Sequence, residues 1–174
     1  MSDPVLNTLR ACVVRGEHRL SSGAETGVYV DARRAILNTG LKAIIKMVHA
    51  AMRSAAIHGG YDPTKMIVAG PVLGGALLAM GIVSRFWIGG ALAVRAAPKG
   101  YGIERRVEGP DTEPGKAAWL VDDVLTTGAS LAAAAEALEQ ERGLRLVGAT
   151  VLVQREPVSL PFPVAALYQM EELL

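Results

Sequence analysis

The chain has 174 residues, of which 51% are hydrophobic and 20% are charged. That length and apolar content fit one domain with a buried core, and they exclude intrinsic disorder, which needs low hydrophobicity and high net charge. Eighteen basic and 17 acidic residues leave a net charge of +1, so we expect neither a nucleic-acid partner nor an anionic membrane surface. The single cysteine, Cys12, allows no intrachain disulfide and favours a reducing compartment, the cytoplasm.

The N-terminal region, about residues 1–40, is expected to form a small hood. Residues 20–33 contain turn-forming residues followed by the segment VYVDAR, which predicts a hairpin.

Apolar strands and helices alternate along the rest of the chain. Apolar residues three and four positions apart predict a helix over 41–55 that stops at Gly59-Gly60. Continuous apolar runs predict strands at 66–69, 91–94, 117–121 and 148–153, and helices are predicted at 74–83 and 131–141. Strands that are apolar on both faces and separated by helices indicate a parallel sheet covered on both sides. The predicted fold is therefore α/β, a doubly wound and mostly parallel sheet flanked by helices, in one domain spanning 1–174.

No charged residue occurs between Lys65 and Arg85, and the run of nineteen residues is long enough to cross a membrane as a helix. Pro71 and four glycines interrupt this run where a buried strand would pass through a loop into a helix. We therefore expect a strand, a loop and a packed helix here, and no membrane span.

The stretch 95–116 separates two predicted strands and shows no periodicity. It contains three prolines and four glycines together with Arg95, Lys99, Arg105 and Arg106. A structureless stretch of this length inside a compact domain is usually a functional lid or a mobile insertion. Its cations favour a lid that closes over an anion.

The run LVDDVLTTGAS, residues 120–130, carries the chemistry. A buried strand is expected to end at Asp122-Asp123, and a loop rich in Thr, Gly and Ser leads into a helix. Ligands of open parallel sheets bind at this edge, where loop N–H groups and the first helical turn can hold an anion. Carboxylates beside an anion cradle suit a sugar phosphate. An ordinary strand–turn–helix with Ser130 as the helix N-cap would leave both aspartates unexplained. The loop at 70–75 is a second possible anion contact.

The run VDDVLTTGAS resembles the phosphoribosyl-pyrophosphate (PRPP) motif of type I phosphoribosyltransferases. Four further segments are similar to the orotate phosphoribosyltransferase family: its hood (16–31), its pyrophosphate-side loop (69–75), its catalytic lid (95–109) and an arginine after the last clear strand, Arg155. The resemblance covers residues 16 to 156.

This resemblance implies roles for individual residues. Lys99, Asp122 and Asp123 would be catalytic, the aspartates holding the ribose hydroxyls. Orotate would contact Thr126, Arg155, Tyr29 and Val30. The implied PRPP-binding residues are Arg95, Lys99, Tyr101, Pro71, Val72, Asp122, Asp123, Val124, Leu125, Thr126, Thr127, Gly128, Ala129 and Ser130. Mg²⁺ would be held mainly through PRPP, with no direct protein ligand, and a homodimer would share its lid residues across subunits.

The predicted reaction joins orotate to the phosphoribosyl group of PRPP, giving orotidine 5′-phosphate and pyrophosphate in de novo pyrimidine nucleotide biosynthesis. The alternatives are a phosphoribosyltransferase for another pyrimidine or purine base, and a PRPP-binding regulatory protein with weak activity. Arg155 favours an acidic pyrimidine. Ala96 and Tyr101 stand where family members frequently have a basic residue and a histidine, and the final helix is expected to be shortened or missing.

Overall fold

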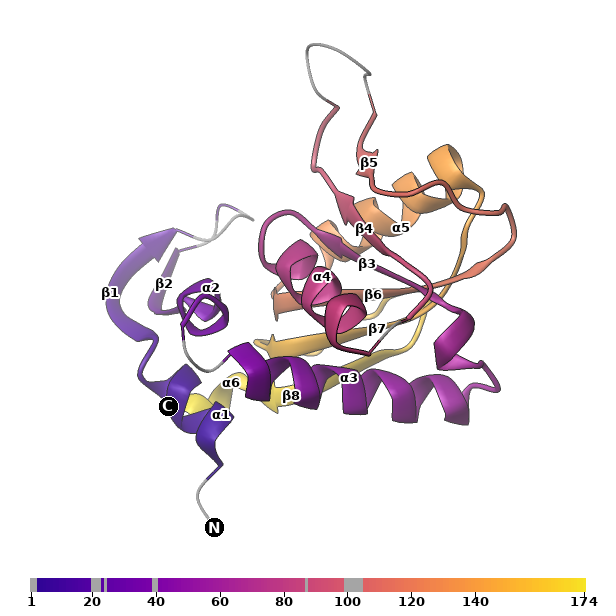
Figure 1. The fold of residues 1–174 in the computed structure, drawn as a ribbon. Helices are drawn as coiled ribbons and strands as arrows, with labels where there is room; N and C mark the ends of the chain where they lie inside the picture. Colours follow the sequence, from indigo (N-terminus) through magenta and orange to yellow (C-terminus); the bar gives the residue numbers. More distant parts are fainter. Residues whose placement is uncertain (1–2, 20–22, 24, 39–40, 87, 99–104) are drawn as a thin grey trace.

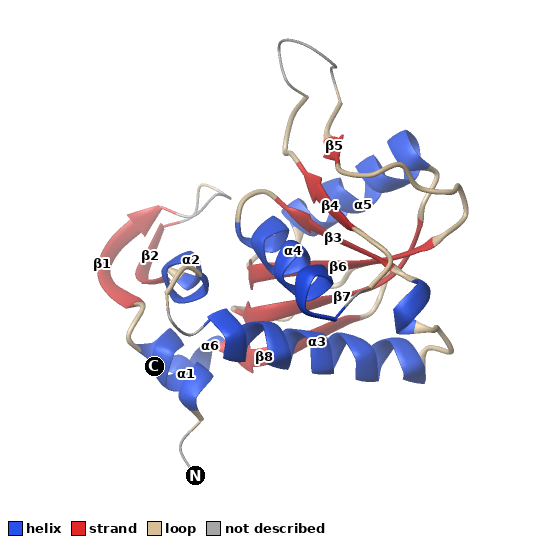
Figure 2. Cartoon of the chain, viewed as in Figure 1, coloured by secondary structure: helices blue, strands red, loops and turns tan. Residues whose placement is uncertain are grey.

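The computed structural model describes residues 3–174 except 20–22, 24, 39–40, 87 and 99–104. Its centre is a six-stranded sheet in the order β5-β4-β3-β6-β7-β8, parallel except where β5 pairs with β4 (Figure 1, Figure 2). In that order the strands are Val107–Glu108, Ala91–Val94, Ile67–Pro71, Ala117–Leu125, Arg145–Gln154 and Val164–Gln169. The predicted α/β class with a mostly parallel sheet is confirmed.

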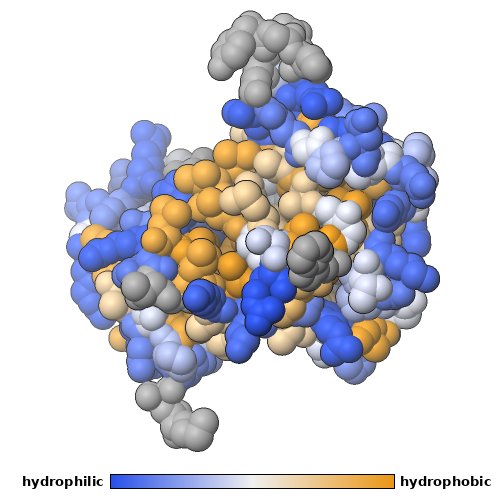
Figure 3. All heavy atoms as spheres, viewed as in Figure 1, coloured by the Kyte–Doolittle hydropathy of each residue, from blue (hydrophilic) through white to orange (hydrophobic). Residues whose placement is uncertain are grey.

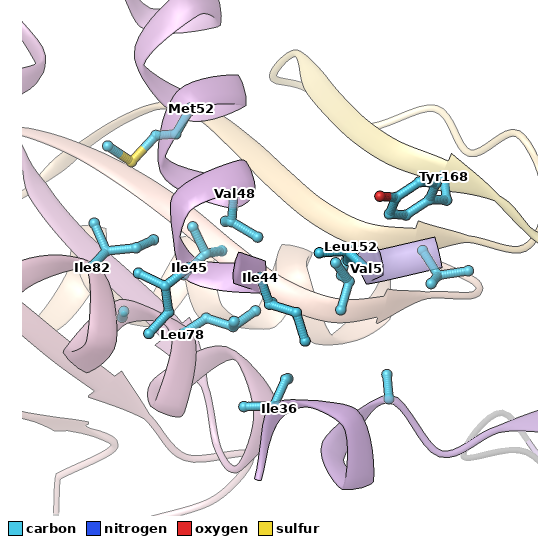
Figure 4. Close-up of a cluster of buried hydrophobic side chains, with 14 of the residues drawn as sticks. Val5, Ile36, Ile44, Ile45, Val48, Met52, Leu78, Ile82, Leu152 and Tyr168 are labelled. Atoms are coloured by element: carbon cyan, nitrogen blue, oxygen red, sulfur yellow. The ribbon is translucent and has the colours of Figure 1, made fainter. Parts of the chain in front are cut away.

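Helices cover both faces of this sheet. Helices α3 (Leu41–His58) and α4 (Gly74–Phe86) pack on one face, and α5 (Ala129–Arg142) packs on the other. Figure 4 shows the first of the two cores, in which α3 and α4 contribute Ile44, Ile45, Val48, Met52, Leu78 and Ile82. Alternate residues of β6 serve the two cores, since Trp119 and Val121 face α4 whereas Ala118 and Leu120 face α5. Because β6 is buried on both faces, its residues 117–121 are continuously apolar, and this apolar run predicts the strand from the sequence.

The N-terminal region contains an antiparallel hairpin, for which we keep the name hood. Strands β1 (Val13–Arg19) and β2 (Glu25–Val30) make a separate antiparallel hairpin, and α2 (Ala32–Ile36) lies between this hairpin and α4 in Figure 1. Helix α1 (Pro4–Arg10) begins at Asp3, whose side chain accepts hydrogen bonds from two N–H groups of its first turn. Cys12 is a buried free thiol.

The uncharged run 66–84 forms β3, a loop and the start of α4, as predicted. No helix in the described part of the chain is both long and apolar enough to span a membrane.

Four expectations need correction. Strand β6 does not end at Asp122-Asp123 but continues to Leu125, because its pairing with β7 continues to that residue. The N-cap of α5 is Gly128, so Ser130 lies inside the helix. The stretch 95–116 is not wholly irregular, since β5 pairs with the end of β4. The chain after 155 contains β8, the single-turn α6 (Met170–Leu173) and an ordered connection; only the shortening of the final helix was expected.

A buried polar contact joins the neighbouring strands β6 and β7. The Trp119 indole Nε1–H donates to the Thr150 hydroxyl at 3.0 Å, and both side chains are buried. The ring also fills the space that a Cβ at Gly148 would occupy. A glycine at 148 therefore makes room for the largest side chain of the core.

We predict that Thr150→Val lowers the free energy of unfolding by about 1–3 kcal/mol, because valine has nearly the same shape but leaves the indole N–H without an acceptor. Urea unfolding followed by fluorescence measures the change. Thr64→Val is the matched control, since its hydroxyl donates to Asp62 at 2.7 Å on the exposed surface and its loss should cost less than about 0.5 kcal/mol. Equal losses in the two variants would contradict this account.

Candidate active site

A cavity of about 290 Å³ opens at the carboxyl ends of the central strands, beneath the hood. The hood, α2, the loop after β3 and the loop after β6 all contribute to its wall. It is lined by Arg19, Tyr29, Val30, Arg33, Pro71, Val72, Leu73, Gly74, Asp122, Asp123, Val124, Thr126, Ser130 and Arg155. Parallel strands place their carboxyl ends at one edge, which is why segments far apart in the sequence meet here.

Asp122 and Asp123 form the floor of this cavity. The Asp123 N–H donates to Asp122 Oδ1 at 2.9 Å, and the Val124 N–H donates to Asp123 Oδ1 at 2.8 Å. Asp122 is only 7% exposed. Burial raises the pKa of its carboxyl well above the usual range, and the neighbouring Asp123 charge raises it further. Two carboxylates held this closely can bind a positively charged group or accept hydrogen bonds from hydroxyl groups.

The loop after β3 approaches these carboxylates closely. A Cβ at Gly74 would overlap the Asp123 carboxylate, so only glycine allows this contact. The loop itself presents no charge to the cavity, because Val72 and Leu73 are apolar and about half exposed. The peptide bond between these two residues is cis.

The predicted anion cradle, Thr126 to Ser130, leads from the end of β6 into the start of α5. Gly128 adopts a φ of +82°, a conformation that favours glycine, and it has no side chain to cap the helix. The Ala129 N–H donates to the Thr127 hydroxyl at 3.4 Å, whereas the N–H groups of Ser130 and Leu131 have no acceptor within the helix and can donate to an anion. Thr126 and Ser130 line the cavity beside them.

Arg155 joins the hood to the end of the sheet. Its guanidinium donates to the Val28 carbonyl and to the Thr26 hydroxyl, each at 3.0 Å. Its backbone N–H donates to the Leu125 carbonyl at 2.9 Å, which fixes the residue beside the end of β6. The predicted carboxylate-binding arginine thus lies in the cavity wall and is held by strand β2.

The structure brings most of the predicted site residues together, with several exceptions. Leu125, Thr127, Gly128 and Ala129 do not line the cavity, although they belong to the cradle that does. Arg95 lies outside it, because its Nε donates to Glu108 at 2.9 Å across the β4–β5 pair. The predicted lid residues Lys99 and Tyr101 lie outside the described residues.

Four cavity residues were not among the predicted site residues, although three of them lie in segments that the sequence analysis singled out. Leu73 and Gly74 belong to the loop that was expected to contact an anion, and Arg19 belongs to the hood. Arg33 lies on the short helix α2, whose packing against α4 and β6 brings it to the cavity. A helix of five residues has too few turns to show periodicity, so its cavity-facing residue could not be read from a pattern.

Among the described residues that line the cavity, the groups that suit a metal ion are oxygen donors, which hard cations prefer. Among the described residues, no cluster of three or more His, Cys, Asp and Glu side chains could hold a metal. The aspartate pair offers two carboxylates, which suit Mg²⁺ when its other ligands come from water and a phosphorylated substrate.

No protein-family model matches the sequence. The orotate phosphoribosyltransferase of Pyrobaculum calidifontis is 37% identical over 166 residues, covering 91% of this chain and 81% of that protein. The orotate phosphoribosyltransferase of Mycobacterium tuberculosis H37Rv has a similar solved structure, with a TM-score of 0.71 and 28% identity over 97% of this chain and 96% of that one. The same protein in complex with PRPP aligns with a TM-score of 0.66 and 25% identity over the same shares of the two chains.

We predict that Asp122→Asn raises the melting temperature at pH 8, because the amide has no charge to bury. A carboxyl whose pKa is higher in the folded than in the unfolded chain disfavours folding increasingly as the pH rises through the folded pKa. The gain of the variant over the wild type should therefore be largest above that pKa and should decline towards pH 4. Thermal unfolding at a series of pH values measures it.

Asp111→Asn is the control for this series, because Asp111 is fully exposed and pairs with Arg142 at 3.4 Å. We expect it to change the free energy of unfolding by less than about 0.5 kcal/mol at every pH. If the Asp122→Asn gain were as large at pH 4 as at pH 8, burial of charge would not be its cause.

Proposed function

The chain belongs to the orotate phosphoribosyltransferase family, and we propose that the cavity beneath the hood is where it joins orotate to the phosphoribosyl group of PRPP. The products are orotidine 5′-phosphate and pyrophosphate, and the reaction belongs to pyrimidine nucleotide biosynthesis. The observation that carries the assignment is one cavity wall that contains the aspartate pair, an anion cradle and an arginine from the end of β7.

Each part of the cavity suits one part of the substrates. The cradle from Thr126 to Ser130 would hold the 5′-phosphate on the N–H groups of α5, and Asp122 and Asp123 would accept hydrogen bonds from the ribose hydroxyls. Arg155 would pair with the orotate carboxylate. Thr126 and the backbone at Tyr29 and Val30 would contact the rest of the base.

The same arrangement suits the chemistry of the transfer. The bond between ribose C1 and pyrophosphate breaks and leaves its electron pair on pyrophosphate, while a ring nitrogen of orotate forms the new bond to C1. Positive charge develops on the ribose in between, directly above Asp122 and Asp123. Carboxylates fixed by backbone N–H groups stabilise that charge without rearranging. A protein nucleophile is unnecessary, since orotate supplies the nitrogen.

The lid residues Lys99, Tyr101 and Arg95 would complete the site on the pyrophosphate side. Lys99 is proposed as a catalytic cation against the leaving group. Arg95 would have to exchange its ion pair with Glu108 for pyrophosphate, and their side chains are 41% and 33% exposed, so the pair is accessible to an anion. Closure over the cavity would exclude water, which would otherwise hydrolyse the activated ribose.

Mg²⁺ is proposed as the cofactor, carried into the site mainly by PRPP. When bound, it would neutralise charge on the pyrophosphate oxygens. Asp122 and Asp123 would act on it through the ribose hydroxyls and its water ligands, which agrees with the two-carboxylate donor set.

A homodimer that shares lid residues across subunits is also proposed. Figure 3 shows an apolar surface over α2 and α4, and Met80 on α4 is 58% exposed. Leu37 at the end of α2 is 67% exposed. A second copy of the chain would cover these side chains. The buried free thiol of Cys12 agrees with a cytoplasmic location.

We predict that the purified protein releases pyrophosphate from PRPP and Mg²⁺ only when orotate is present. The test is a pyrophosphate-release assay with a panel of pyrimidine and purine bases. Uracil is the sharpest comparison, because it lacks only the carboxylate that Arg155 would pair with. Turnover with uracil or a purine but not with orotate would contradict the assignment of the base. No turnover with any base would favour a PRPP-binding regulatory role.

We predict that Arg155→Ala raises KM for orotate roughly 10- to 100-fold and KM for PRPP much less, because a lost charge-assisted pair costs about 1.5–3 kcal/mol. Steady-state kinetics with each substrate varied measures the two effects.

Thr26→Val is the matched control for this variant. It removes one hood partner of the Arg155 guanidinium but leaves the cation in place. We expect a change in KM for orotate of less than about threefold, because the second bond of the guanidinium, to the Val28 carbonyl, still holds it in the cavity wall. If Thr26→Val matched Arg155→Ala, or if KM for PRPP rose as much as KM for orotate, Arg155 would act by holding the hood.

A further inference from the structure

Arg33 is a charged residue of the cavity wall to which the reaction described above gives no role. It lies on α2, where Ala32, Ala35 and Ile36 face the core and Arg33 faces the cavity. Its Nη2 donates to the Tyr29 hydroxyl at 3.3 Å, and this is the only hydrogen bond of its guanidinium among the described residues. Since a guanidinium has five N–H donors, most of them remain available to a ligand.

The position of Arg33 in the cavity indicates which end of PRPP it would contact. The guanidinium interacts electrostatically with Asp123, and the Asp123 carboxylate rests against Gly74 of the loop after β3. Helix α2 packs against α4, which begins at that loop. Arg33 therefore belongs to the part of the wall formed by α2 and the loop after β3, whereas the predicted anion cradle of α5 is formed by a different segment, Thr126 to Ser130. With the 5′-phosphate in that cradle and the ribose over the aspartates, the wall of Arg33 is left for pyrophosphate.

The loop on this side cannot neutralise pyrophosphate by itself. Its cavity-lining side chains Pro71, Val72 and Leu73 carry no charge. A multiply charged anion beside an apolar loop and two carboxylates needs cations close by. The lid supplies some, but Arg95 is already paired with Glu108.

Of the other two arginines of the cavity, Arg155 is more fully engaged, because both of its terminal nitrogens donate to the hood strand β2. Arg155 is also assigned to the base. Arg19 donates through Nε to the Gly23 carbonyl at 3.4 Å, at the outer end of β1. Arg33 is the cavity arginine that donates to Tyr29 and interacts electrostatically with Asp123.

We propose that Arg33 binds the pyrophosphate group of PRPP and stabilises it as the leaving group, a role that rests on the proposed transferase function. The guanidinium would exchange its long hydrogen bond with Tyr29 for charge-assisted bonds to pyrophosphate oxygens. Its attraction to Asp123 favours its position in the cavity wall before PRPP binds.

The test compares Arg33→Ala and Arg33→Lys with the wild type. Calorimetry with inorganic pyrophosphate and Mg²⁺ gives Kd, and steady-state kinetics gives KM for PRPP and for orotate. We expect Arg33→Ala to raise Kd for pyrophosphate and KM for PRPP roughly 10- to 100-fold, with KM for orotate changed less than about threefold. Arg33→Lys keeps the charge and should recover part of the loss.

Two further variants separate binding from structural effects. Arg34→Ala removes the adjacent arginine, which does not line the cavity, and should leave Kd for pyrophosphate unchanged. Tyr29→Phe removes only the hydroxyl contact, and if it reproduced Arg33→Ala, Arg33 would act by holding Tyr29. An unchanged Kd for pyrophosphate in Arg33→Ala, or an equal rise in KM for orotate, would overturn the proposal. Wild-type protein that binds pyrophosphate but turns over no base would instead contradict the transferase function.

Discussion

The parallel pairing of β3, β6 and β7 is the constraint from which the site follows. Because all three strands run the same way, the loop after β3, the aspartate pair of β6 and Arg155 after β7 emerge at one edge. Two layers of helices bury both faces of these strands, so the edge cannot shift without disturbing both cores. The cavity therefore depends on groups held by the most deeply packed part of the molecule, whereas the hood contributes from outside it.

The rigid packing of the sheet holds the Asp122 carboxyl in a buried position. Asp122 and Asp123 lie within a strand whose other residues are apolar, and Asp122 is more buried than Asp123 and Val124. Placing a carboxyl there raises its pKa, which means that the folded chain bears an electrostatic cost at neutral pH. Backbone N–H groups of Asp123 and Gly75 offset only part of that cost. A substrate that brings hydroxyl groups and positive charge would relieve the rest, so a group that destabilises the free protein can favour the complex.

Burial decides which strands and helices could be predicted from the sequence. Strands β3, β4, β6 and β7 were found because burial on both faces makes them continuously apolar, and α3 because one face is buried along eighteen residues. Strand β8 lies at the sheet edge with only partial burial, which leaves no such run. Ser130 was a reasonable N-cap by residue type, but Gly128 holds that place, because its φ of +82° favours glycine and a Cβ there would meet Val158 and Leu160.

Cavity residues that belong to a contiguous sequence motif could be predicted. Arg33, which reaches the cavity only through tertiary packing, could not. The run from Asp122 to Ser130 could be recognised because its residues are consecutive in the sequence, from the end of β6 to the first turn of α5. Arg33 comes to the cavity only through the packing of a five-residue helix between the hood and α4. The hood is itself held to the sheet partly by the Arg155 guanidinium, which donates to Val28 and Thr26. A ligand that drew Arg155 away from these acceptors would loosen β2 and, with it, the position of Tyr29 beside Arg33. Binding of the base at Arg155 would then affect binding of pyrophosphate at Arg33 through the hood, although the base would not contact Arg33 and pyrophosphate would not contact Arg155.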